Sequence, residues 1–160
     1  MMMEEIGERL VLVMNSVGIE IVDHIKQALS EKGKDATGAL SESIRYNITD
    51  GPSGLTLNIT SLDYLRNVND GRKPGKMPPS NKLIPWVQAR GIRMTTKSGG
   101  IVPAASAAFV IAKSIGEKGI KPTNILDDTQ QWIIENKLPQ FSDAVTNDIN
   151  DMVKNLFDNI

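Results

Sequence analysis

The first thirty residues carry a helical pattern of apolar positions. Apolar side chains recur there at steps of three and four residues, the spacing of one face of an α-helix: Ile6, Leu10, Val13, Val17, Ile21, Ala28 and Leu29. The pattern predicts an amphipathic helix over about residues 4–31, and Gly33 is a stop signal just beyond it. A helix of about 28 residues is long for one domain, so we expect part of it to lie against a partner or apart from the core.

Two runs of strict alternation follow, after a polar connector at 37–44 that is expected to hold a short helical turn. Ile44, Tyr46 and Ile48 alternate with polar residues, and so do Leu55, Leu57 and Ile59. Between the two runs lies the turn-forming segment Asp-Gly-Pro-Ser-Gly. Alternation around such a segment predicts a β-hairpin in which the apolar residues of both strands share one face.

The middle of the chain mixes short helices with loops. Residues 61–70 predict a short helix with Leu62, Leu65 and Val68 facing inward, and residues 81–90 predict another, ending at Gly91. Residues 71–80 hold three prolines and two glycines, which predict an exposed, semi-rigid loop. Residues 95–100 are polar and rich in glycine, so we expect a mobile tip there.

The last third of the chain is expected to be helical. Residues 103–118 predict a helix that begins near Pro103 and ends before Gly119. Two further helical segments follow from Asp127, with a break near Leu138–Pro139. The fold class is therefore α+β, a small antiparallel sheet built around a hairpin with a long N-terminal helix and C-terminal helices. We expect an α+β domain over 1–125 and a helical extension over 126–160 that acts as an interaction arm.

Composition removes several kinds of chemistry. The 160 residues include no cysteine, which excludes disulfides, thiol nucleophiles and thiolate metal sites. His24 is the one histidine, so a metal site with two histidines from one chain is also excluded. We expect a packed or surface role for His24 rather than a catalytic one. No apolar run approaches the roughly 20 residues that span a bilayer, so we expect no membrane-embedded segment.

Charge is balanced overall but not along the chain. The formal net charge is −1, yet the segment 66–97 holds eight basic residues against Asp70 alone, and 124–160 holds seven acidic residues against two lysines. Such a split can bind nucleic acid through its basic part, or bring the basic segment of one subunit to the acidic segment of a neighbour. The alternative is two solvated faces with no binding role.

Several motifs, taken in order, carry a resemblance. Residues 37–44 read Thr-Gly-Ala-Leu-Ser-x-Ser-Ile, and after the hairpin residues 64–79 read Tyr-Leu-x-x-Val-x-x-Gly-Arg-Lys-Pro-Gly-Lys-x-Pro-Pro. Two more motifs follow. Residues 86–92 read Trp-x-x-x-x-Gly-Ile, which marks a helix end, and residues 108–120 read Ala-Phe-x-Ile-Ala-x-x-Ile-x-x-x-Gly-Ile. Over roughly residues 30–130 this order resembles the small neck and tail-completion proteins of tailed bacteriophages, which lie between the head portal and the tail.

The resemblance implies an α+β subunit of a ring or collar, with no enzymatic activity and no cofactor. Its partners would be copies of itself, adjacent neck, portal or tail proteins, and packaged DNA by non-specific contact. Its location would be the virion, after synthesis in the host cytoplasm. The family commonly ends soon after the Gly-Ile helix, whereas this chain continues for about forty residues. The resemblance therefore leaves the C-terminal tail unexplained.

We expect no catalytic residue and no metal site, and we name instead two sets of candidate residues for a subunit interface or a DNA passage. The first set belongs to the basic middle segment and comprises Arg66, Arg72, Lys73, Lys76, Lys82, Trp86, Arg90 and Arg93. The second set forms an apolar stripe on the last predicted helix and comprises Phe141, Val145, Ile149, Met152 and Leu156. A terminal helix this apolar must bury its stripe, on its own domain or on a neighbour.

Two other function classes stay open. A nucleic-acid-binding module would use the basic segment 66–97, although the sequence offers no recognisable reading helix and few aromatic residues. A small hydrolase or nuclease would need a cluster of carboxylates or histidines, and the pair Asp127–Asp128 is better explained as acidic residues at the start of a helix.

Overall fold

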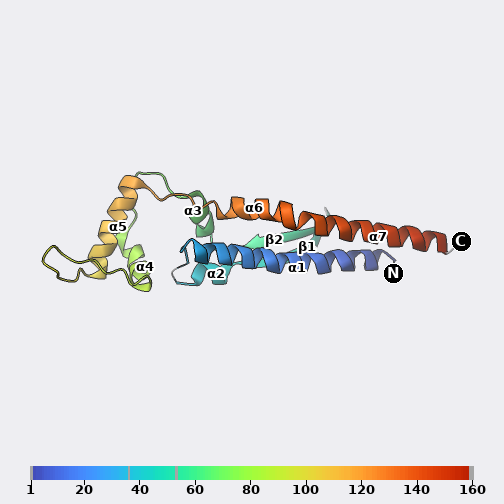
Figure 1. Ribbon diagram of the computed structural model, residues 1–160, viewed down its shortest axis with the longest axis horizontal. Helices are drawn as coiled ribbons and strands as arrows, with labels where there is room; N and C mark the ends of the chain where they lie inside the picture. Colours follow the sequence, from blue (N-terminus) through green and yellow to red (C-terminus); the bar gives the residue numbers. More distant parts are fainter. Residues whose placement is uncertain (1, 36, 53, 159–160) are drawn as a thin grey trace. The chain divides into compact units, whose positions relative to one another are not determined.

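The protein is an α+β chain that divides into two compact units (Figure 1). The computed structural model describes residues 2–35, 37–52 and 54–158, with the backbone alone for residues 2–8 and 155–158. Unit 1 comprises Met1–Ala28, Glu42–Ser61 and Ile125–Ile160, and unit 2 comprises Leu29–Ser41 and Leu62–Asn124. One division between the units, at 124/125, lies beside the predicted boundary 125/126, but residues 125–160 share unit 1 with the first helix and the hairpin.

Helix α1 (Met2–Glu31) confirms the long amphipathic helix. Its buried apolar face includes two residues of the predicted stripe within unit 1, Val17 and Ile21, and Leu29 beyond the division. Leu10, Val13 and Ala28 are half-buried, and the side chain of Ile6 lies outside the described residues. Met14, Val22 and Ile25 are buried as well, which widens the face beyond the predicted stripe.

Strands β1 (Arg45–Gly51) and β2 (Gly54–Thr60) form the predicted antiparallel hairpin. The register pairs Tyr46 with Ile59 and Ile48 with Leu57, so the apolar residues of both strands do share a face. The hairpin packs against α1, because a Cβ at Gly18 would lie 2.5 Å from the Tyr46 ring. The Tyr46 hydroxyl also donates a hydrogen bond to Asn15 Oδ1 at 3.2 Å.

Helices α6 (Ile125–Asn136) and α7 (Leu138–Asp158) complete unit 1. The predicted break is confirmed at Lys137, and Pro139 falls in the first turn of α7, where its missing N–H costs no helical bond. Both helices run antiparallel to α1. His24 meets Thr129 on α6, while Arg9 meets Asp151 on α7, so residues later in the chain contact residues earlier in α1.

Two short helices come next, of which the first crosses the division between the units and the second lies in unit 2. Leu40, which is fully buried, lies on α2 (Ala39–Ser43), and Leu65 is buried on α3 (Tyr64–Asp70). The prediction that Leu62 faces inward is wrong, because Leu62 precedes the N-cap of α3 and is 46% exposed. The end of α3 is held by the segment that follows the last helix of unit 2, since Thr123 N–H donates to the Asn69 carbonyl at 2.9 Å.

The core of unit 2 joins a 3₁₀ turn, η1 (Ser80–Leu83), to α4 (Ile84–Ala89) and α5 (Ala104–Lys118). Val87, Ala107 and Ala108 form its buried centre. The small alanines let α4 approach α5 closely, and half-buried side chains close the cluster: Leu83, Ile84, Ile92, Met94, Ala104 and Ile111. Residues 95–100, predicted as a mobile tip, lie in a hydrogen-bonded loop in which Thr96 N–H donates to the Gly100 carbonyl at 2.8 Å.

Candidate functional site

A backbone clasp fixes the basic loop of unit 2. Arg72 N–H donates to the Ile120 carbonyl at 2.8 Å, and Ile120 N–H donates back to the Arg72 carbonyl at 2.7 Å. Gly75 N–H donates to the Gly116 carbonyl at 2.8 Å. These bonds join the Gly-Arg-Lys-Pro-Gly-Lys segment to the end of α5. The proline-rich loop is therefore anchored at its backbone and leaves its side chains available for contact.

Glycines make this clasp sterically possible. A Cβ at Gly71 would lie 2.4 Å from the Ile120 carbonyl oxygen, and a Cβ at Gly119 would lie 2.1 Å from the Arg72 carbonyl oxygen. Both residues also have positive φ, +69° and +74°, which L side chains rarely adopt. A Cβ at Gly116 would meet Met77 Cα at 3.1 Å. Two motifs that lie more than forty residues apart in the chain are thus parts of one structure.

All the basic candidates of the middle segment belong to unit 2, and their side chains are exposed: Arg66, Arg72, Lys73, Lys76, Lys82, Arg90 and Arg93. The Arg72 guanidinium also donates to the Lys76 carbonyl, which braces the loop. Lys82 on η1, Trp86 on α4 and Arg90 at the C-cap of α4 follow one another at four-residue steps, and we call these three residues the basic row. Trp86 is 37% exposed within this row.

Formal charge separates between the two units. Unit 1 holds fourteen acidic and five basic residues, a net charge of −9, while unit 2 holds five acidic and thirteen basic residues, a net charge of +8. A chain that is almost neutral as a whole is therefore strongly polarised between its units. The sequence shows part of this split, but the acidic residues of α1 and α7 join into one unit only through the fold.

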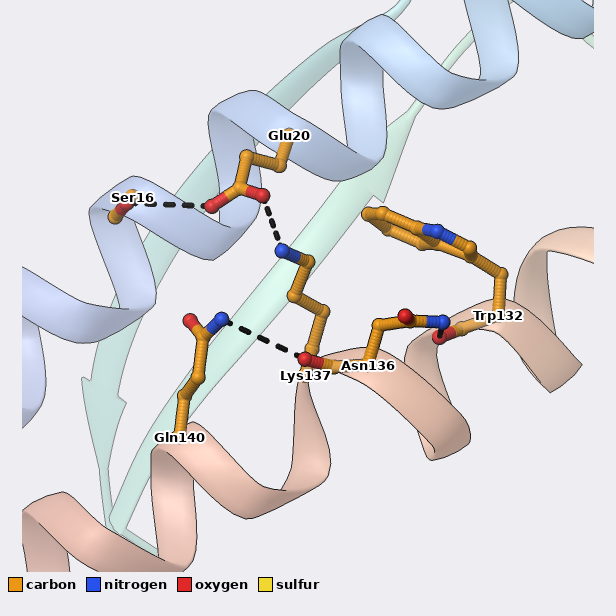
Figure 2. Close-up of polar contacts among 6 residues, drawn as sticks. All are labelled: Ser16, Glu20, Trp132, Asn136, Lys137 and Gln140. Carbon is orange, nitrogen blue, oxygen red and sulfur yellow. Dashed lines mark hydrogen bonds and ion pairs between the residues drawn. The ribbon is translucent and has the colours of Figure 1, made fainter.

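A buried lysine links α1 to the junction of α6 and α7 (Figure 2). Lys137 is 7% exposed and its ammonium is paired with the Glu20 carboxylate. The ammonium also lies 4.9 Å from the centre of the Trp132 ring, a cation–π contact. The half-buried Trp132 thus contacts a buried charge, and the sequence alone does not indicate Lys137 because its partner is more than a hundred residues away.

His24 packs against Trp132 and Thr129 within unit 1. Its ring stacks on Trp132 with the centres 4.3 Å apart and an angle of 15° between the planes. The Thr129 hydroxyl donates to the Ile125 carbonyl at 2.7 Å, so its oxygen accepts from His24 Nδ1 at 3.2 Å. The stacked ring and the hydroxyl contact join α1 to α6 within unit 1.

The apolar candidates of α7 lie in different environments. Phe141 is half-buried, while Val145, Ile149 and Met152 are 44%, 52% and 36% exposed. Leu156 belongs to α7, but its side chain lies outside the described residues. The helix instead turns Ala144 and Asp148 inward.

Asp148, one of the acidic residues of the segment 124–160, is buried on α7. It is 4% exposed and lies 3.6 Å from the Arg9 guanidinium, which also pairs with Asp151 at 2.5 Å. These residues flank a groove of about 580 Å³ between α1 and α7, lined by Arg9, Leu12, Val13, Gln140, Asp143, Ala144, Asn147 and Asp151. No local pattern in the sequence indicates this pairing, because Arg9 is an isolated basic residue.

One tyrosine of unit 2 has a perturbed acidity. Partial burial, and secondarily the negative charge of Asp35, raise the pKa of Tyr64 above its ordinary value of 10.0. Both causes oppose formation of the tyrosinate. Tyr64 opens the longest of the motifs at the first turn of α3, so its ionisation provides a titratable marker for this region.

Among the described side chains, no three histidine, cysteine, aspartate or glutamate residues gather as a metal site would require. In the same part of the chain, no helix has both the length and the apolar character needed to cross a membrane. No family model, curated protein or solved structure matches this chain. The candidate residues that the structure exposes belong to the basic loop and row of unit 2 and to the apolar face of α7.

Proposed function

We propose that this chain is a non-enzymatic assembly protein of a tailed bacteriophage, a neck or tail-completion subunit that works in a homo-oligomeric ring of the virion. The observation that carries the proposal is the clasp between residues 71–76 and 116–120. These two segments both belong to the ordered motifs that resemble the neck family. Their glycines are required for close approach of the backbones, so the motifs act together as one scaffold for exposed basic side chains.

Two further features support a structural role in an assembly. α7 presents several large apolar side chains to solvent, which is typical of a surface that another protein covers. The polarised units provide two different surfaces, and a ring built by head-to-tail contacts requires two different surfaces on each subunit.

The test is electron microscopy of the purified full-length chain together with mass measurement over a range of concentrations. A ring subunit gives closed particles with one copy number. A chain that stays monomeric at all concentrations, or forms only open filaments, contradicts the proposal.

The net charge of unit 2 favours one second candidate, a nucleic-acid-binding module that uses the segment 66–97. Such a module binds duplex DNA as a monomer, and its affinity falls steeply with salt because phosphate contacts release counterions. Fluorescence anisotropy with labelled duplex DNA at two salt concentrations distinguishes the candidates. Tight, salt-sensitive binding without any ring favours the module.

A further inference from the structure

An unpartnered apolar stripe runs along α6 and α7 of unit 1. It comprises Ile134, Leu138, Val145, Ile149, Met152 and Val153, whose exposed fractions range from 36% to 57%. Within α7, steps of three, four and seven residues place Leu138, Val145, Ile149, Met152 and Val153 beside the face that buries Ala144 and Asp148, and Ile134 lies on α6 before the break at Lys137. We call this set the C-terminal stripe. Contiguous apolar surface of this kind marks a site that a partner covers.

Unit 2 carries a surface of matching character. The basic row of Lys82, Trp86 and Arg90 combines an exposed indole with two positive charges, and the exposed Arg93 and Lys97 follow it in the chain. Tryptophan and arginine are the residues that most often anchor protein interfaces. The row also lies in the unit with a net charge of +8, whereas the stripe lies in the unit with a net charge of −9.

From this complementarity we infer that the basic row of one copy docks on the C-terminal stripe of a second copy. The inference rests on the proposed role as a ring subunit and names the contact that would build the ring. Opposite charge attracts unit 2 of one copy to unit 1 of the next, while like units repel each other. The same attraction suits a reciprocal two-fold pair and a head-to-tail contact, and the proposed ring requires the head-to-tail contact, which generates rings or filaments.

A second copy fits these observations better than DNA does. A phosphate backbone needs basic groups but provides no partner for the six apolar side chains of the stripe. DNA close to the basic row would also meet a molecule that carries fourteen acidic residues on its other unit. A copy of this chain covers both surfaces at once.

The experiment is a charge swap on the full-length chain. The unit 2 variant carries Lys82→Glu, Arg93→Glu and Lys97→Glu. The unit 1 variant carries Gln131→Lys, Glu135→Lys and Ser142→Lys, three exposed positions that lie along the edge of the stripe by their helical spacing. A matched control, Asn47→Lys with Asp50→Lys and Thr56→Lys, changes the net charge of unit 1 equally but on exposed positions of the hairpin. All substituted side chains are exposed, and circular dichroism melting verifies the fold of each variant.

Sedimentation velocity at about 50 mM and about 1 M salt measures association. We expect wild type to associate at low salt, each swap variant alone to associate at least about tenfold more weakly, and an equimolar mixture of the two to recover association. The hairpin control should behave like wild type. The inference is overturned if wild type stays monomeric, if either swap variant associates like wild type, if the mixture does not recover, or if the hairpin control loses association to the same degree.

Failure of this contact and failure of the proposed function have different signatures. Closed rings that persist in both swap variants leave the ring role standing and remove the contact. A mixture that recovers association but gives only open filaments or pairs keeps the contact and removes the ring role. Loss of bound duplex DNA by the unit 2 variant, without recovery in the mixture, assigns the basic row to nucleic acid instead.

Discussion

Single glycines decide how unit 2 holds its basic loop. Gly119 has a φ of +74°, and a Cβ placed on it would lie 2.1 Å from the Arg72 carbonyl oxygen, whereas nothing lies within 4 Å of a Cβ at Gly75. We expect Gly119→Ala to lower the free energy of unfolding by about 2 kcal/mol or more, through both strain and displacement of the loop. Gly75→Ala, the matched control in the same loop, should change it by less than about 0.5 kcal/mol. Urea denaturation of both variants measures the difference.

A third glycine separates the two causes. Gly99 has a φ of +85° but nothing within 4 Å of its Cβ position. Gly99→Ala should therefore cost only the conformational strain, about 1 kcal/mol. If Gly119→Ala costs no more than Gly99→Ala, the close backbone approach contributes nothing and the clasp is looser than its distances indicate.

The Lys137–Glu20 pair should respond differently to loss of each partner. Glu20→Ala leaves a buried ammonium with only the Trp132 ring beside it, so we expect a loss of about 2 kcal/mol in the free energy of unfolding. Lys137→Met keeps an apolar stem in the same space and leaves a carboxylate that is 41% exposed, so it should cost less than about 1 kcal/mol. Thermal and urea unfolding of the two variants show which substitution lowers the free energy of unfolding more. The reverse order would show that Glu20, and not Lys137, is the desolvated partner.

Tyr64 predicts how stability changes in alkali. Its pKa is raised in the folded state, so the unfolded chain loses the phenolic proton first as pH rises. The contribution of Tyr64 to stability is fully present below about pH 10 and is lost as pH rises through the raised folded-state pKa. Tyr64→Phe should remove this part of the alkaline decline, as measured by urea unfolding below and above pH 10. An unchanged alkaline slope in Tyr64→Phe would contradict the prediction.

At the scale of elements, the hairpin offers a test of its buried face. Leu57 is half-buried opposite Ile48, while Thr56 is exposed on the other face of the same strand. Leu57→Asp places a charge against apolar neighbours and should cost about 1–3 kcal/mol. Thr56→Asp introduces the same residue, with the same low strand preference, and should cost about 0.5 kcal/mol. Circular dichroism melting compares them, and equal losses would reject the shared apolar face.

The elements that sequence predicted well are those with long or strict periodicity. α1, the hairpin and the break between α6 and α7 all follow from local spacing and from turn residues, which act on near neighbours. Leu62 was predicted to face inward because it fits the helical spacing of Leu65, but the helix begins after it. The burial of Asp148 was not predictable, because the residue that neutralises it, Arg9, is 139 positions earlier in the chain.

In the candidate site, too, local features were predictable from the sequence and contacts between distant segments were not. The exposure of the basic middle segment was predictable, since prolines and glycines interrupt it and prevent burial in a regular element. The clasp was not predictable, although its signal lay in the glycines at 71, 116 and 119, because their spacing in sequence says nothing of their distance in space. The grouping of α1 with α7 needed contacts that join the two ends of the chain.

At the scale of the whole molecule, the two tryptophans report on the two units separately. The chain has two tryptophans, Trp86 in unit 2 and Trp132 in unit 1. In a Trp132→Phe background, Gly119→Ala should shift the fluorescence-detected unfolding of Trp86 to lower urea. In a Trp86→Phe background, the same substitution should leave the unfolding of Trp132 unchanged, because Gly119 lies in the other unit. Equal shifts of both signals would show that the chain unfolds as one cooperative body.

Because α1 pairs with α6 and α7, unit 1 can be completed only at the end of translation. His24 reaches Thr129 across 105 positions and Arg9 reaches Asp151 across 142, so the ribosome must pass both distant positions before α1 finds these partners. Residues 62–124 of unit 2 emerge earlier and can fold while the C-terminal helices are still being made. A nascent or prematurely terminated chain therefore displays the basic row without the C-terminal stripe. Only a finished polypeptide carries both halves of the proposed contact, so an incomplete copy that docks through its basic row would end a growing assembly instead of extending it.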